Sequence, residues 1–246
     1  MIEPLTVIRD LGQDAAVVFV HGFTGHASRT WGDFPQLLAK DTTLRGWDIF
    51  AVGYPSSLLI DIPGVWTADP DIGALATGLA TTLKLPPLRD RKALAILAHS
   101  MGGLIAQRAI LDDDQIARRV QHLILFGTPS GGLVKGRFGR LIKRQIRDMA
   151  DDGPFIAGLI RDRQCWFEGP ARFKLHAVAG NRDEFVPEVS SLRPFPRECW
   201  EMVDGNHLQI VKPDGPNHKS VLLVKAALSG HGLAANASDG AMIAVE

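Results

Sequence analysis

Short apolar runs alternate along the chain with segments whose apolar residues recur at helical spacing. An apolar run bounded by charged or turn residues is typical of a strand buried on both faces of a parallel sheet. Such runs predict strands at Ala15–Val20, Trp47–Val52, Ala93–Ala98, Gln121–Phe126, Lys174–Ala179 and Glu198–Val203, and the loose alternation of Leu5–Arg9 predicts an edge strand. Helical spacing predicts helices at Trp31–Lys40, Asp71–Leu85, Pro154–Arg163 and His218–Ser229, and directly after Ser100. This alternation predicts an α/β fold with a mostly parallel central sheet flanked by helices.

The pattern changes period at Ser100. The apolar run Ala93–Ala98 leads into His99-Ser100-Met101-Gly102-Gly103, and a helical pattern follows. A serine at a sharp strand-to-helix turn among small residues is the pattern of a nucleophile elbow. We expect Ser100 to have a strained backbone and to stand at a helix N-terminus, where N–H groups face developing negative charge. An ordinary strand-to-helix turn is the alternative, because Ala98 stands where glycine is usual.

A glycine-containing loop follows the strand Ala15–Val20 at once, with the sequence His21-Gly22-Phe23-Thr24-Gly25. Loops at the carboxyl ends of central strands are where α/β sheets bind ligands. The backbone N–H groups of Phe23 and of Met101, the residue after Ser100, are therefore the predicted pair of oxyanion-hole donors. The alternative is a plain turn between a strand and a helix.

An acid and a base are expected downstream, each after a late strand. Asp183 follows the strand Lys174–Ala179 and precedes Val-Pro, and Glu184 is the fallback acid. His207 lies in a loop directly after the strand Glu198–Val203, whereas His218 starts a helix and His231 lies near the end of the chain. We therefore predict that Asp183 and His207 are the acid and the base.

Four histidines that precede the acid are expected to be turn or core residues: His21, His26, His122 and His176. His99 adjoins Ser100 and is expected to face away from it, since neighbouring side chains of a strand point to opposite faces.

Ser100, Asp183 and His207 together supply the chemistry of a serine hydrolase. A serine hydroxyl is a poor nucleophile, so His207 must take its proton during attack on a carbonyl. Imidazole titrates near ~6.5, so it can accept and return a proton at neutral pH. Asp183 would hold the imidazole tautomer, and water would then release the acyl group. This chemistry needs no metal and no cofactor.

Composition limits the other functions. The chain has 246 residues, 46% of them hydrophobic, and a formal net charge of zero, so no overall field favours nucleic acid. The two cysteines, Cys165 and Cys199, are expected to be inert core thiols, and no Cys/His cluster suggests zinc. No apolar stretch reaches membrane-spanning length, and Met1–Gln13 lacks the apolar core of a signal peptide, so a cytoplasmic protein is expected.

Lys135–Arg147 carries six basic residues and no acid, with apolar residues at helical spacing. It predicts a basic amphipathic helix that could contact an anionic membrane surface, the alternative being a solvated cap helix. With Pro154–Arg163 it would form a small helical cap around residues 133–170. We expect one domain over residues 1–230, followed over 231–246 by a flexible tail or a linker of a longer protein.

These motifs resemble those of the α/β-hydrolase superfamily. The resemblance rests on His21–Gly25 with Thr30-Trp31, Ala98–Leu104, Phe126–Pro129 and Asn206–Pro213. They are most similar to lipase-like serine esterases, the branch with the serine-active-site-containing proteins and the PGAP1-like lipases. Ala98 replaces a usual glycine, and some members carry histidine where Ser130 stands.

The resemblance covers roughly residues 15–228. It implies an ester or phospholipid-type substrate and the triad Ser100, Asp183 and His207. In that branch the domain is often the N-terminal piece of a larger signalling or defence protein. A catalytically silent module used in binding or regulation remains an alternative, as do an amidase, a thioesterase and an acyltransferase.

Overall fold

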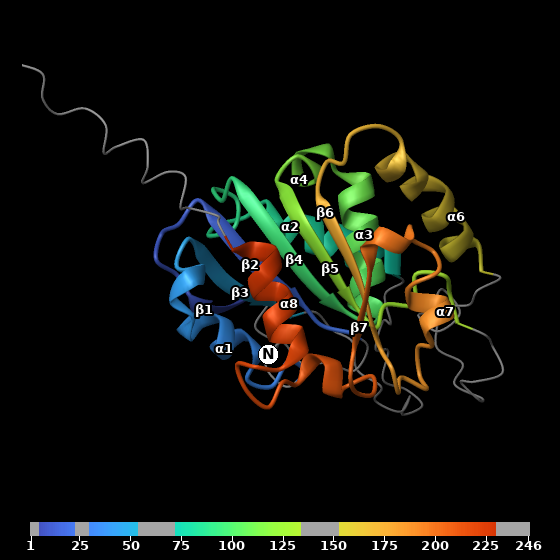
Figure 1. Cartoon of the computed structure of the whole chain (residues 1–246). Helices are drawn as coiled ribbons and strands as arrows, with labels where there is room; N and C mark the ends of the chain where they lie inside the picture. Colours follow the sequence, from blue (N-terminus) through green and yellow to red (C-terminus); the bar gives the residue numbers. More distant parts are fainter. Residues whose placement is uncertain (1–4, 23–29, 54–71, 134–152, 230–246) are drawn as a thin grey trace, which may run out of the picture.

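The computed structural model describes residues 5–22, 30–53, 72–133 and 153–229. Its centre is a seven-stranded sheet with the order β1-β3-β2-β4-β5-β6-β7 (Figure 1). The strands are β1 (Leu5–Arg9), β2 (Ala15–Val20), β3 (Trp47–Val52), β4 (Ala93–His99), β5 (Val120–Phe126), β6 (Lys174–Gly180) and β7 (Trp200–Val203). β1 pairs antiparallel with β3, and every other pairing in the sheet is parallel. The predicted α/β fold with a mostly parallel sheet is confirmed.

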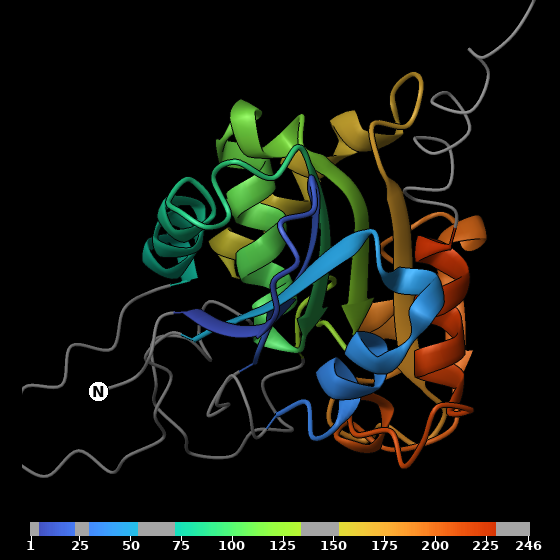
Figure 2. The same cartoon turned by 90° about the vertical axis from the view of Figure 1, so that its left-hand side faces the viewer.

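Helices cover both faces of this sheet, as Figure 2 shows. The α-helices are α1 (Phe34–Lys40), α2 (Ile72–Leu83), α3 (Met101–Asp112), α4 (Asp114–Ala117), α6 (Pro154–Asp162), α7 (Glu188–Ser191) and α8 (Lys219–Leu228). The 3-10 turns are η1 (Thr42–Leu44), η3 (Arg163–Phe167), η4 (Arg197–Cys199) and η5 (Gln209–Val211). α1 and α8 lie on one face, while α2, α3 and α6 lie on the other (Figures 1 and 2).

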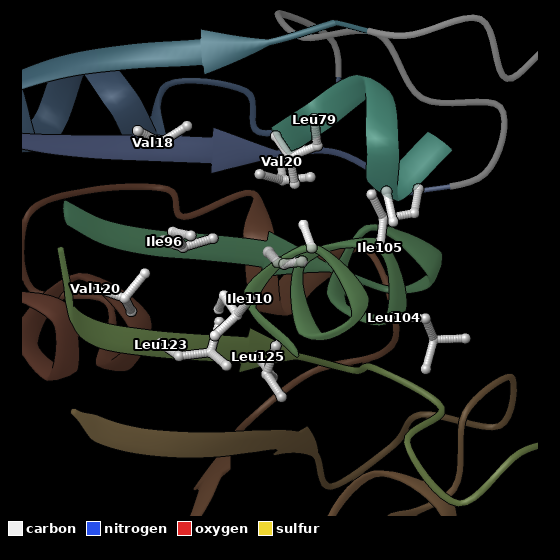
Figure 3. Close-up of a cluster of buried hydrophobic side chains, with 14 of the residues drawn as sticks. Val18, Val20, Leu79, Ile96, Leu104, Ile105, Ile110, Val120, Leu123 and Leu125 are labelled. Carbon is white, nitrogen blue, oxygen red and sulfur yellow. The ribbon is translucent and has the colours of Figure 1, made fainter. Parts of the chain in front are cut away.

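Alternate residues of each central strand enter different cores, because successive side chains point to opposite faces. Val18 and Val20 of β2 join Ile96, Leu123 and Leu125 against α2 and α3 (Figure 3). Phe19 of β2 points the other way and meets Trp31 and Phe34 edge to face, with ring centroids 4.8 and 5.8 Å away. Burial on both faces explains why the central strands read as continuous apolar runs.

Some predicted elements have different bounds. The helix expected over Trp31–Lys40 begins only at Phe34, after a turn, and the strand expected from Glu198 begins at Trp200 after η4. Of the expected cap around 133–170, the structure describes α6 and η3, and α6 buries Ile156 and Leu159 in the core beside α3. The basic segment Lys135–Arg147 and the tail 231–246 lie outside the described residues.

Candidate active site

Ser100 lies between β4 and α3, at the carboxyl edge of the sheet. Its φ of 55° and ψ of −130° are unusual for a residue with a side chain, and no other non-glycine residue in the described ranges has a positive φ. The Ser100 N–H donates to the carbonyl of Phe126, the last residue of β5, at 2.9 Å. The strained turn expected of a nucleophile elbow is therefore present at this serine.

The loop after β2 comes close to Ser100. A Cβ atom added at Gly22 would lie 2.8 Å from the Cβ of Ser100 and 3.0 Å from the His99 carbonyl oxygen. Only glycine fits such an approach, so this residue lets the two strand ends meet. Phe23, the predicted oxyanion donor that follows, lies outside the described residues.

Met101, the other predicted donor, is the first residue of α3 and is fully buried. The first N–H groups of a helix have no acceptor within the helix. The Met101 N–H is therefore available to a negatively charged oxygen beside Ser100, with the positive end of the helix dipole behind it.

The structure brings Asp183 and His207 together although they are 24 residues apart in the chain. Asp183 Oδ2 lies 2.7 Å from His207 Nδ1, and the Asp183 carboxylate is fully buried. The other carboxylate oxygen, Oδ1, accepts hydrogen bonds from the N–H groups of Phe185 at 2.9 Å and Val186 at 2.8 Å. With the acceptor on Nδ1, the imidazole carries its proton there and leaves the Nε2 lone pair to act.

A capping box holds the turn that carries His207. The Asn206 side chain accepts from the N–H of Gln209 at 3.0 Å, and Gln209 Oε1 accepts from the N–H of Asn206 at 3.0 Å. This reciprocal pair fixes the turn on both sides of the histidine. The spacing Asn-x-x-Gln is visible in the sequence, so this support could have been found there.

His99, the residue before Ser100, contacts the same turn through a hydrogen bond that the sequence did not predict. His99 Nε2 lies 2.9 Å from the carbonyl oxygen of His207, and the two ring centroids are 4.6 Å apart. Burial first, and the nearby His207, His21 and Lys212 after it, hold the pKa of His99 well below its usual value. His99 is thus a neutral imidazole in contact with the candidate base.

Arg163 ties together segments behind the site. This buried guanidinium donates to Gln107 Oε1 at 3.0 Å and to the carbonyl oxygen of Ser130 at 3.1 Å. It also lies over the ring of Phe195, 4.6 Å from its centroid. Burial lowers the pKa of Arg163 to about 10, so it is still charged at neutral pH. It joins α3, the helix that follows Ser100, to the loop after β5.

The other expected residues lie elsewhere. Glu184, the fallback acid, is exposed, and the His218 side chain accepts from the N–H of Ser220 at the start of α8. Cys199 is half-buried but Cys165 is exposed, so the expectation of a core thiol is wrong for Cys165, which lies on the surface turn η3.

Within the described ranges, no group of three or more His, Cys, Asp and Glu residues could hold a metal ion. In the same part of the chain, no helix is long and apolar enough to cross a bilayer.

Comparison with known proteins shows a family match over most of the chain. Residues 17–223 match the profile of the Alpha/beta hydrolase family. The SERAC1 protein of Bos taurus is 22% identical over 238 residues, which cover 81% of this chain and 36% of SERAC1, and that of Mus musculus matches equally. The chain thus spans about a third of the length of these curated relatives.

Two solved structures illustrate the likeness. Phospholipase PlaB from Legionella pneumophila superimposes with a TM-score of 0.66 and 15% identity, over 91% of this chain and 61% of that one. Lipase BlEst2 from Bacillus licheniformis, in its mature form, superimposes with a TM-score of 0.60 and 16% identity, over 92% of this chain and 98% of that one. At such identities the likeness establishes the fold. The match over residues 17–223, together with this sheet, shows that the chain belongs to the α/β hydrolase family.

Proposed function

We propose that this protein is a serine hydrolase that cleaves carboxylic esters through an acyl-enzyme. The observation that carries the proposal is the convergence of two features at one edge of the sheet. One is the strained turn at Ser100, and the other is the hydrogen bond of 2.7 Å between His207 and Asp183. This convergence supports the assignment of Ser100 as nucleophile, His207 as base and Asp183 as its partner.

The reaction proceeds in two halves. Ser100 Oγ attacks the ester carbonyl carbon while His207 Nε2 takes the hydroxyl proton, and the oxyanion is stabilised by the Met101 N–H and by that of Phe23. The carbon–oxygen bond to the alcohol breaks, and His207 returns the proton to the leaving alcohol. Water then attacks the acyl-enzyme with His207 as base, and the acid product leaves as Ser100 is restored. Asp183 stabilises the imidazolium in both halves.

The structural neighbours support an ester as the substrate and a lipid ester as the first class to test. They include a lipase and a phospholipase, and another is described as a membrane phospholipase A. The basic segment Lys135–Arg147 supports the proposal of contact with anionic lipid. Replacing its lysines and arginines by glutamine is expected to weaken binding to phosphatidylserine vesicles, and unchanged binding would remove this part of the proposal.

The test is hydrolysis of p-nitrophenyl esters of increasing acyl length, together with labelling by a fluorophosphonate. We expect turnover and one adduct, which mass spectrometry assigns to Ser100. Ser100→Ala should abolish both, whereas Ser229→Ala, at an exposed serine at the end of α8, should change neither. Turnover that survives in Ser100→Ala would refute the assignment.

Two other outcomes point to two of the remaining alternatives. Labelling of Ser100 with transfer of the acyl group to an added alcohol or amine in preference to water would indicate an acyltransferase. No labelling and no turnover, with anionic vesicles absent or present, would favour a silent binding module.

A further inference from the structure

His99 makes a contact that the proposed mechanism does not use. It is the last residue of β4, directly before Ser100, and its ring is buried against that of His207. Strand β4 therefore supplies the nucleophile turn and, one residue earlier, a side chain that reaches the base. The two residues joined by this contact are 108 positions apart in the chain.

The protonation state of His99 follows from its partners. Its Nε2 atom faces a carbonyl oxygen at 2.9 Å, which only accepts hydrogen bonds, so Nε2 must carry the proton. Its Nδ1 atom is buried and has no hydrogen-bond partner among the described residues. A proton on Nδ1 would therefore be an unsatisfied buried donor, which costs free energy.

A positive charge on His99 is also unfavourable, because it would require a proton on the buried Nδ1 atom, which has no partner in the described part of the chain. Among the described residues, the charged or titratable groups that affect His99 most are His207, His21 and Lys212, and none of these three is an acid. His207 becomes a cation during each half of the reaction, so a second positive charge at a centroid distance of 4.6 Å would oppose it. A buried neutral imidazole donates a hydrogen bond without adding that charge.

The bond also serves the backbone of the turn. His207 is not in a regular helix, and its carbonyl receives the His99 donor, while the capping box fixes Asn206 and Gln209 on either side. The imidazole itself contacts two rings, those of His99 at 4.6 Å and Phe185 at 5.0 Å, and Asp183 holds its Nδ1. Each of these contacts restricts the direction of Nε2, the atom that must take the serine proton.

We propose that His99 is a positioning residue, which aligns the base by donating its Nε2–H to the carbonyl oxygen of His207 and by packing against the His207 ring. This inference rests on the proposed function, since it assigns His207 as the base. The structure couples the strand of the nucleophile directly to the loop of the base, so the two are aligned as one unit.

The test compares two amides that differ in reach. In His99→Gln, the side-chain amide nitrogen can occupy the position of Nε2. In His99→Asn, the shorter side chain places its amide nitrogen near the position of Nδ1, where it cannot reach the His207 carbonyl. We expect His99→Asn to lower kcat by roughly ten- to a hundredfold with little change in KM, because a displacement of about 1 Å can cost a factor of about a hundred. His99→Gln should recover most of that loss. His99→Leu, if it folds, should resemble His99→Asn.

His122→Leu is the matched control, since His122 is also buried but lies four residues farther from the site along the paired strands, opposite Ala95. It should leave kcat unchanged. Equal kcat values in His99→Asn, His99→Gln and the wild type would overturn the proposal, as would an equal loss in the two amide variants.

A readout without turnover separates this inference from the proposed function. The proton on His207 Nδ1, bonded to Asp183, should give a downfield proton NMR signal in the wild type and in His99→Gln. In His99→Asn it should shift or broaden as the ring loses its alignment. An unaltered signal in His99→Asn refutes the positioning role. If the wild type shows neither turnover nor labelling, the proposed function fails while this signal still tests the contact.

Discussion

Gly127→Ala tests whether the geometry between acid and base limits the reaction. Gly127 follows β5 with a φ of +50°, and a Cβ atom placed there would lie 3.1 Å from both Asp183 Oδ2 and His207 Nδ1. Contacts of that length require a neighbour to move by a few tenths of an ångström. The two nearest atoms are the two ends of the Asp183–His207 hydrogen bond, so the substitution acts on that bond directly.

Two effects add in this variant, and they differ in what they change. The left-handed backbone costs alanine about 1–2 kcal/mol, which lowers the free energy of unfolding. The displacement of the acid and base lowers kcat, by roughly tenfold for a shift well under 1 Å. KM for a short soluble ester should stay nearly constant, because the interactions that are lost belong to the transition state.

Gly12→Ala isolates the first effect. Gly12 has a φ of +73°, and no atom of the described residues lies within 4 Å of an added Cβ atom, so it carries backbone strain without contact to the site. Urea unfolding should show a similar loss of stability in both variants, while kinetics with p-nitrophenyl acetate should show the loss of kcat in Gly127→Ala alone. A kcat for Gly127→Ala equal to that of Gly12→Ala would refute the reasoning.

Three further predictions concern single side chains. Asp183→Asn should lower kcat by about 10⁴ while leaving the fold intact, since the amide favours the wrong imidazole tautomer, and steady-state kinetics with circular dichroism checks both. Arg163→Met should lower the free energy of unfolding by roughly 3 kcal/mol, measured in urea, because buried oxygens of Gln107 and Ser130 lose their donor. Asp113→Ala removes the cap of α4 and should cost about 1 kcal/mol at pH 7. The bond to Lys84 first, and the N–H groups of α4 with it, hold the pKa of Asp113 below its usual value, so this stabilisation is present above pH ~4 and is lost as pH falls through the folded-state pKa. The difference between Asp113→Ala and the wild type in urea unfolding should therefore vanish at low pH.

Local patterns in the sequence carried much of the fold. Strands buried on both faces are continuous apolar runs, so β2 and β3 have the predicted bounds, and so does the edge strand β1. The change of period at Ser100 marks the elbow, because a sharp turn needs small neighbours and the helix after it has its own spacing. The positions of Asp183 and His207 follow from one rule, that parallel strands bring the loops at their carboxyl ends to one edge.

Local patterns in the sequence do not predict contacts between segments that are distant in the chain. The expectation for His99 used only strand alternation relative to Ser100, and alternation does not say which loop will meet the side chain. Its partner is a backbone carbonyl, and because every residue has one, the type of residue at position 207 does not indicate this hydrogen bond. Arg163 likewise binds mostly backbone oxygens, and an arginine at the end of an amphipathic segment, close to Arg161 and Asp162, looks like a solvated residue.

On heating, the parts of the site are expected to lose their structure at different temperatures, depending on where their strands lie in the sheet. The proposed nucleophile, Ser100, follows β4, which is hydrogen-bonded on both sides by β2 and β5. The proposed base, His207, follows β7, a strand of four residues at the edge of the described sheet, where it pairs only with β6. Edge strands open locally at a lower free energy than central ones. Fraying of β7 would release the base while the central sheet stays folded. Activity is therefore expected to disappear at a temperature below the midpoint of global unfolding. The hydrogen bond from His99 to the His207 carbonyl should raise the temperature at which this loss occurs.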